Sequence, residues 1–213
     1  MSAKRDSIIT TAMRLFNQYG FTNIGIDRII DESGVAKMTF YKHFPSKNQL
    51  IRQCLIERDR FIREQVNQRL LLANTDVHSQ IRALFDWYQD WFMQKDFFGC
   101  MFIKASDEFG NDSTIQTIIL THKQWLAQKI EEVLTAGNIA DAITKAKQIQ
   151  IALDGAIVNE HSYQNHLSIS PLCQNSCHPH PNNPIGVKGD NHGTIQRRTQ
   201  TSHTRQTFIT HTH

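Results

Sequence analysis

The chain has 213 residues, of which 39% are apolar, and a formal net charge of +3. This length and composition allow one or two compact globular units and exclude a wholly disordered protein. The apolar runs are short and the first residues lack the apolar core of a signal peptide, so we expect no membrane partner and a cytoplasmic location. Four cysteines form neither a disulfide-dense pattern nor paired Cys-x-x-Cys motifs, which agrees with a reducing compartment and predicts no structural metal.

Charge is segregated along the sequence. Residues 1–60 contain 10 Lys and Arg against 6 Asp and Glu, residues 61–170 contain 9 against 13, and residues 171–213 contain 4 against 1. The segment from Lys37 to Arg52 has four basic residues and no acid, a pattern that suits a polyanionic partner. The alternative interpretation of this segment is a merely solvated helix face.

Helical periodicity dominates the N-terminal part of the chain. A first amphipathic helix is predicted to end at Gly20, because glycine is favoured directly after a helix. Gly34 closes a short second helix, and a third runs from Lys37 to Phe44 with Phe40 and Phe44 facing inward at i, i+4. The result is two short helices joined by a glycine turn.

Pro45 stops the third helix, and Ser46 followed by Gln49 is a capping box that opens a fourth helix reaching about Leu72. Further helices are predicted from Val77 to Phe92, from Met101 to Phe109, from Ile115 to Val133 and, capped by Asp141, from Ala142 to Ile157. We therefore predict an all-α protein.

The composition changes abruptly at Pro171. Residues 171–213 hold four of the five prolines, six of the eleven histidines and only eight apolar residues, so they are predicted to be an irregular or disordered tail. Such a switch resembles out-of-frame translation. The Cys173, Cys177, His178 and His180 cluster matches no zinc module. The predicted organisation is a helix-turn-helix domain over 1–47, a helical ligand-binding and dimerisation domain over 48–170, and this tail.

The two short helices have the geometry of a helix-turn-helix motif. Their apolar residues, including Ile29, Ile30 and Phe40, pack them against the first helix. This leaves one set of side chains free to enter a DNA major groove: Lys37, Thr39, Tyr41, Lys42 and His43. Thr39 and Tyr41 suit phosphate or base-edge contacts, and the lysines supply charge.

The run Gly-Val-Ala-Lys-Met-Thr-Phe-Tyr-Lys-His-Phe-Pro-Ser-Lys, which follows a helix ending in Tyr-Gly-Phe, resembles the DNA-binding domain of TetR/AcrR-type transcriptional regulators. The resemblance implies that Lys37 to Phe44 is the recognition helix, that Thr39, Tyr41, Lys42 and His43 contact DNA, and that Lys47 touches phosphate. The family more usually has a small residue at the position of Met38. This departure bears on which operator sequence is bound and not on DNA binding itself.

Aromatic residues are dense in the second domain. Ten lie within 41 residues: Phe85, Trp87, Tyr88, Trp91, Phe92, Phe97, Phe98, Phe102, Phe109 and Trp125. One core stripe does not need so many rings, and pockets for small molecules are built in this way between helices. The candidate pocket walls are Trp91, Phe102, His122 and Trp125. The alternative is that these rings are ordinary core residues.

No nucleophile elbow, phosphate loop or metalloprotease motif is found, so we predict no enzyme and no cofactor. By the resemblance, the expected function is a repressor that binds a palindromic double-stranded DNA operator as a homodimer and releases it when a small-molecule inducer binds. The alternative is a small-molecule-binding helical protein with compromised dimerisation and DNA binding.

Members of this family resemble one another in dimerising through a bundle of the last two helices of each subunit. Only the first of these is recognisable here, so the stripe of Ile149, Leu153, Ala156 and Ile157 is expected to be partly exposed. The homodimer is therefore expected to be weak.

Overall fold

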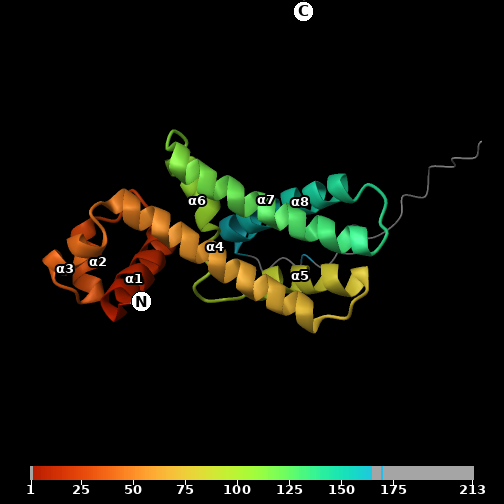
Figure 1. Ribbon diagram of the computed structural model, residues 1–213, viewed down its shortest axis with the longest axis horizontal. Coiled ribbons are helices and arrows are strands. Elements are labelled where there is room, and N and C mark those ends of the chain that lie inside the picture. The colour runs from red at the N-terminus through yellow and green to blue at the C-terminus, as the bar shows by residue number, and fades with distance from the viewer. Residues whose placement is uncertain (1, 165–168, 170–213) are drawn as a thin grey trace, which may run out of the picture. The chain divides into compact units, whose positions relative to one another are not determined.

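The computed structural model describes residues 2–164 and 169, and this part of the chain is made of helices with no strand (Figure 1). The eight helices are α1 (Ala3–Tyr19), α2 (Ile26–Ser33), α3 (Lys37–His43), α4 (Lys47–Leu72), α5 (Val77–Phe92), α6 (Met101–Glu108), α7 (Ser113–Ala136) and α8 (Ala142–Tyr163). The all-α prediction is confirmed. No helix in this part of the chain is long and apolar enough to cross a membrane.

The first three helices form a small cluster at the N-terminal end (Figure 1). Gly20 follows α1 with a φ of 83°, and Gly34 follows α2 in the left-handed region with a φ of 67°. Residues other than glycine rarely adopt such backbone angles, so both turns depend on these two glycines. Phe16, Phe21 and Phe40 are fully buried and join the three helices around one core.

Helix α4 begins where the sequence predicts, because the Ser46 hydroxyl accepts a hydrogen bond of 3.2 Å from the backbone N–H of Gln49. It continues for 26 residues to Leu72. It packs against α1 and also against α5 and α7, so its apolar residues belong to both groups of helices.

Helices α5 to α8 form the second group. Asp76 caps α5 and Asp112 caps α7 with their carboxylates, whereas Asp141 does not cap α8. The prediction for Asp141 is wrong, because this residue has a φ of 56° and no hydrogen bond from its side chain to the helix. A capping side chain needs an extended backbone, which directs it toward the free N–H groups of the first turn.

Helix α8 lies beside α7 and also contacts α5 (Figure 1). These contacts bury Ile149, Leu153 and Ile157, so the expected exposure of the stripe is wrong for these three residues, whereas Ala156 is half-buried. The large apolar side chains that α7 and α8 expose are Leu120, Ile143, Ile151, Val158 and Tyr163. The stripe is buried because α8 turns it toward its own chain. The predicted tail over 171–213 lies outside the described residues.

Candidate functional site

Helix α3 is held in place by two phenylalanines one turn apart. Phe40 is fully buried and Phe44 is 4% exposed, with their ring centroids 6.2 Å apart. The Tyr41 ring meets the Phe40 ring edge to face at 5.4 Å. This packing is typical of stable aromatic pairs and fixes the rotation of the short helix. The opposite face of α3 therefore points away from the core.

The six residues predicted to contact DNA lie at α3 and at the start of α4. Lys37, Tyr41 and Lys42 are exposed, and the other three, Thr39, His43 and Lys47, are partly buried. Met38 is also on this surface, and 81% of it is exposed. Met38 is not among the predicted contact residues, but its spacing of three and four residues from Tyr41 and Lys42 places it on their face.

In the folded protein, acidic residues from other parts of the chain lie close to the basic residues of α3 and α4. The Lys37 Nζ atom lies 3.3 Å from Asp27 Oδ1 on α2, and both side chains are exposed. An exposed pair of this kind contributes little to stability, so Lys37 can exchange Asp27 for a phosphate. The Lys47 Nζ donates to the Thr22 carbonyl at 3.3 Å, and burial lowers the pKa of Lys47 although Glu108 opposes this shift.

Helix α6 is hydrogen-bonded to the turn between α1 and α2. The Glu108 carboxylate accepts from the backbone N–H of Phe21 at 3.0 Å and of Thr22 at 2.6 Å. Burial raises the pKa of Glu108, but these two backbone bonds and the charge of Lys47 outweigh it and hold the pKa below its usual value. The Lys104 ammonium also donates to the Asn17 carbonyl of α1. Helix α6 is therefore hydrogen-bonded directly to α1 and to the turn that follows it.

The four predicted pocket residues fall into two separate places. The ring of Phe102 stacks on His122 with centroids 3.8 Å apart and planes within 8°, and Trp125 lies 6.4 Å from His122. Trp91 lies instead among other rings, 5.8 Å from Trp87 and 5.1 Å from Phe97. The structure therefore brings three of the residues together and leaves Trp91 apart.

His122 is held by charged partners that the sequence reasoning did not identify. Its Nδ1 lies 2.8 Å from Asp59 Oδ1, and the other oxygen of Asp59 accepts from Arg63 Nε at 2.7 Å. Burial lowers the pKa of His122, and Asp59 only partly opposes this. Burial would raise the pKa of Asp59, but the bonds from His122 and Arg63 lower it overall. A neutral His122 that donates to a carboxylate is the arrangement these directions favour.

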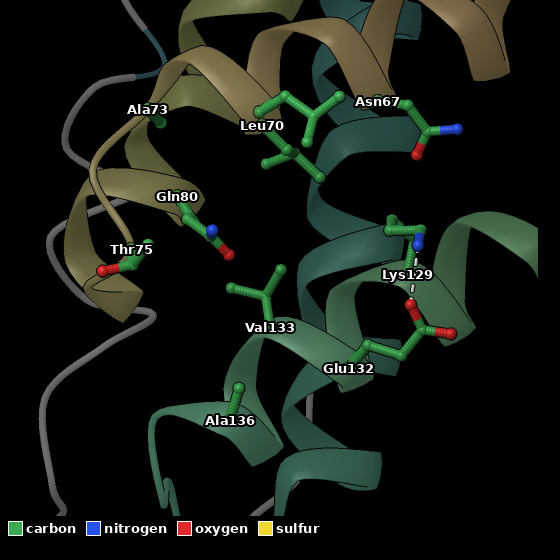
Figure 2. Close-up of a pocket in the computed structure, with 10 residues that line it drawn as sticks. Asn67, Leu70, Ala73, Thr75, Gln80, Lys129, Glu132, Val133 and Ala136 are labelled. Carbon is green, nitrogen blue, oxygen red and sulfur yellow. Dashed lines mark hydrogen bonds and ion pairs between the residues drawn. The ribbon is translucent and has the colours of Figure 1, made fainter.

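Several cavities border the second group of helices, and two of them lie beside α4 and α5. One of about 570 Å³ lies between the end of α4, the start of α5 and the end of α7. In Figure 2, Leu70 and Val133 point into it from α4 and α7, the amide of Gln80 faces it from α5, and the Lys129–Glu132 ion pair stands at its side. A smaller cavity of about 230 Å³ includes Trp91 in its wall. Neither is lined by Phe102, His122 or Trp125.

Comparison with known proteins gives a consistent assignment for these helices. The family model of bacterial regulatory proteins of the tetR family matches residues 8–54. A TetR-family transcriptional regulator from Streptomyces coelicolor has a crystal structure that superimposes with a TM-score of 0.76 at 28% identity, covering 81% of this chain and 92% of that chain.

Among curated proteins, the HTH-type transcriptional regulator LmrA of Bacillus subtilis is 38% identical over 80 residues, which is 37% of this chain and 42% of LmrA. The HTH-type transcriptional activator FasR of Mycolicibacterium smegmatis is 30% identical over 106 residues, which is 49% of this chain and 47% of FasR. The chain spans less than half the length of these two relatives. The proteins it resembles are named as regulators of transcription and not as enzymes.

Proposed function

We infer that this chain belongs to the TetR family of bacterial regulatory proteins, that it binds duplex DNA through α3, and that it regulates transcription in the cytoplasm. We further propose that it is a repressor, that it binds a palindromic operator as a homodimer, and that a small-molecule inducer releases it. One relative is named an activator, so the direction of regulation is the part of the proposal that an experiment has to decide.

The outward face of α3 is the observation that carries the DNA-binding proposal. Phe40 and Phe44 anchor the helix from one side, while Lys37, Tyr41 and Lys42 are exposed on the other. Lysine releases counterions when it meets phosphate, and a tyrosine hydroxyl can bond to a phosphate or a base edge. A recognition helix in a major groove needs this combination of a fixed inner face and a polar, basic outer face.

The bonds from α6 supply a route by which a bound inducer would act on DNA. Glu108 and Lys104 connect α6 to the backbone of α1 and of the turn that follows it. A ligand that binds more tightly to one position of α6 shifts the population toward that position. The DNA-binding helices would follow, because their backbone groups bond to α6. The spacing of two recognition helices in a homodimer is sensitive to such a shift.

Selection of binding sites from random duplex DNA tests the proposal. The full chain is expected to enrich a palindromic motif, and the Lys37/Tyr41/Lys42 triple alanine variant is expected to lose that enrichment. Its salt dependence should flatten by about two units, since about one unit is lost with each phosphate contact. The control is an Arg82/Lys95 double alanine variant, which removes two exposed charges far from α3 and should bind as the wild type does.

A transcription assay on the selected site then separates repression from activation. A second candidate function is a helical protein that binds a small molecule but dimerises and binds DNA poorly. The cavities beside α4, α5 and α7 favour its ligand-binding part, and the described residues supply only one of the last two helices expected for the dimer bundle. Enrichment of no motif by a correctly folded chain would support this second candidate and contradict the first.

A further inference from the structure

Arg58, near the middle of α4, has a largely buried side chain that rests on aromatic rings. Its Cζ atom lies 5.5 Å from the centroid of Phe61 and 5.4 Å from the centroid of Trp91 on α5. Guanidinium groups are attracted to the faces of aromatic rings, most strongly when water is excluded. The two rings therefore hold the charged end of Arg58 against the surface of α5.

No carboxylate within the described residues forms an ion pair with Arg58, and no hydrogen bond of its guanidinium is found there. Burial lowers the pKa of Arg58, while Cys100 and Asp96 oppose the shift from beyond ion-pair distance. By contrast, Arg63 on the same helix pairs with Asp59. A desolvated cation without a paired anion is costly even when aromatic rings support it, and an anion that reaches it gains a strong interaction.

Arg58 borders the small cavity of about 230 Å³ between α4 and α5. Three aromatic rings line this cavity, those of Phe61, Trp87 and Trp91, and the amides of Gln65 and Gln94 add polar groups. The second arginine in its wall, Arg69, is already paired with Asp90. The volume is below that of pockets for drug-sized molecules, so the cavity suits a ligand with a single ring.

We propose that this cavity binds a small aromatic carboxylate, whose carboxylate pairs with Arg58 and whose ring packs among Phe61, Trp87 and Trp91. The planar guanidinium offers two parallel N–H donors to the two carboxylate oxygens. The tryptophan rings provide flat apolar surfaces for the ring of the ligand. The binding of such a ligand is independent of the function proposed above. Its role as the inducer rests on that proposed function.

Arg58 also borders two further cavities, of about 470 and 170 Å³, which are lined in part by Met13 of α1. The same side chain therefore faces the ligand cavity on one side and the DNA-binding helices on the other. A carboxylate that pairs with the guanidinium draws it toward α5 and away from Met13. This places the ligand where its binding energy can alter the packing of α1 on α4.

Titration of the full chain with benzoate in the absence of DNA tests the binding, at constant ionic strength and with tryptophan emission as the signal. Benzamide, which has the same ring but no charge, is the matched probe. Benzoate is expected to quench the emission of Trp87 and Trp91 saturably. It is also expected to bind at least about tenfold more tightly than benzamide, because its hydrogen bonds with Arg58 join two charged groups and contribute at least this factor in affinity.

The Arg58→Met variant keeps most of the side-chain volume and is expected to weaken benzoate binding by about tenfold to a hundredfold. The control Arg82→Met removes an exposed arginine of α5 and should leave binding unchanged. Equal binding of benzoate and benzamide by the wild type, or no saturable quenching by benzoate, overturns the proposal without reference to any variant. So does unaltered benzoate binding by a folded Arg58→Met protein. Because DNA is absent from these titrations, failure here leaves the operator selection as a separate test of the proposed function.

Discussion

The contact between α6 and the turn that follows α1 leads to a measurable prediction. The Glu108→Ala substitution removes the acceptor of two backbone N–H groups, those of Phe21 and Thr22. Hydrogen bonds to a charged group contribute about 1.5–3 kcal/mol when partly buried, as at Phe21, and about 0.5 kcal/mol when solvent competes, as at Thr22. We therefore expect the free energy of unfolding to fall by about 2–3 kcal/mol.

Urea denaturation followed by circular dichroism measures this change. Asp107→Ala is the matched control, because Asp107 is the exposed neighbour of Glu108 on the same helix and should change the free energy of unfolding by less than about 0.5 kcal/mol. Glu108→Gln keeps an acceptor but not the charge, so its effect is expected to lie between those of alanine and the wild type.

The pH dependence provides an independent check. Since the folded protein holds the pKa of Glu108 below its ordinary value of 4.5, the ionised carboxylate stabilises the fold above that pH, and this contribution is lost as the pH falls through the lower folded value. The difference between wild type and Glu108→Ala should shrink accordingly in acid. Equal urea midpoints for Glu108→Ala and Asp107→Ala at neutral pH would refute the contact as a source of stability.

Three further predictions concern helices α7 and α8. Leu153→Ala should lower the free energy of unfolding by about 2–5 kcal/mol, because Leu153 is fully buried. In the same urea denaturation assay, the control Ile151→Ala should change the free energy of unfolding by less than about 0.5 kcal/mol, because Ile151 is 71% exposed. Analytical ultracentrifugation of the full chain should show a dimer that Ile151→Glu weakens, because Ile151 lies on the exposed apolar face of α8, and that truncation before residue 171 leaves unchanged. Loss of the dimer on truncation would contradict this. Because folding lowers the pKa of His122, the melting temperature of the protein should fall as the pH drops below 6.5. His122→Phe should make this decrease shallower. Equal dependence of the melting temperature on pH in the two proteins would show that His122 does not cause the decrease.

Much of the helical framework was predictable because its signals are local. Gly20 and Gly34 end helices, Ser46 starts one, and Phe40 and Phe44 recur at the spacing of one helix face. Each of these features depends on residues within about one turn of the helix, so the sequence contains all the information they require. The family resemblance carried by the run from Gly34 to Lys47 has the same origin, because the short recognition unit is built from neighbouring residues.

The sites depend instead on residues that are distant along the chain. Glu108 bonds to Phe21, which is 87 positions away, and His122 bonds to Asp59, which is 63 positions away. No periodicity relates such pairs, so the sequence predicts His122 as a site residue but neither its carboxylate partner nor the contact of α6. Trp91 and Phe102 are close in the sequence but lie in separate places, because proximity in sequence does not determine which side of a helix a ring faces.

Helix α8 shows the difference most clearly. The sequence determined that one stripe of α8 is apolar, but both that stripe and the opposite face carry large apolar residues, Leu153 on one and Ile151 on the other. Which of them is buried depends on how α8 turns against α5 and α7. The rotation of α8 about its axis depends on how much apolar area the three helices together remove from water. That area is a property of the packed helices and cannot be read from the sequence of α8 alone.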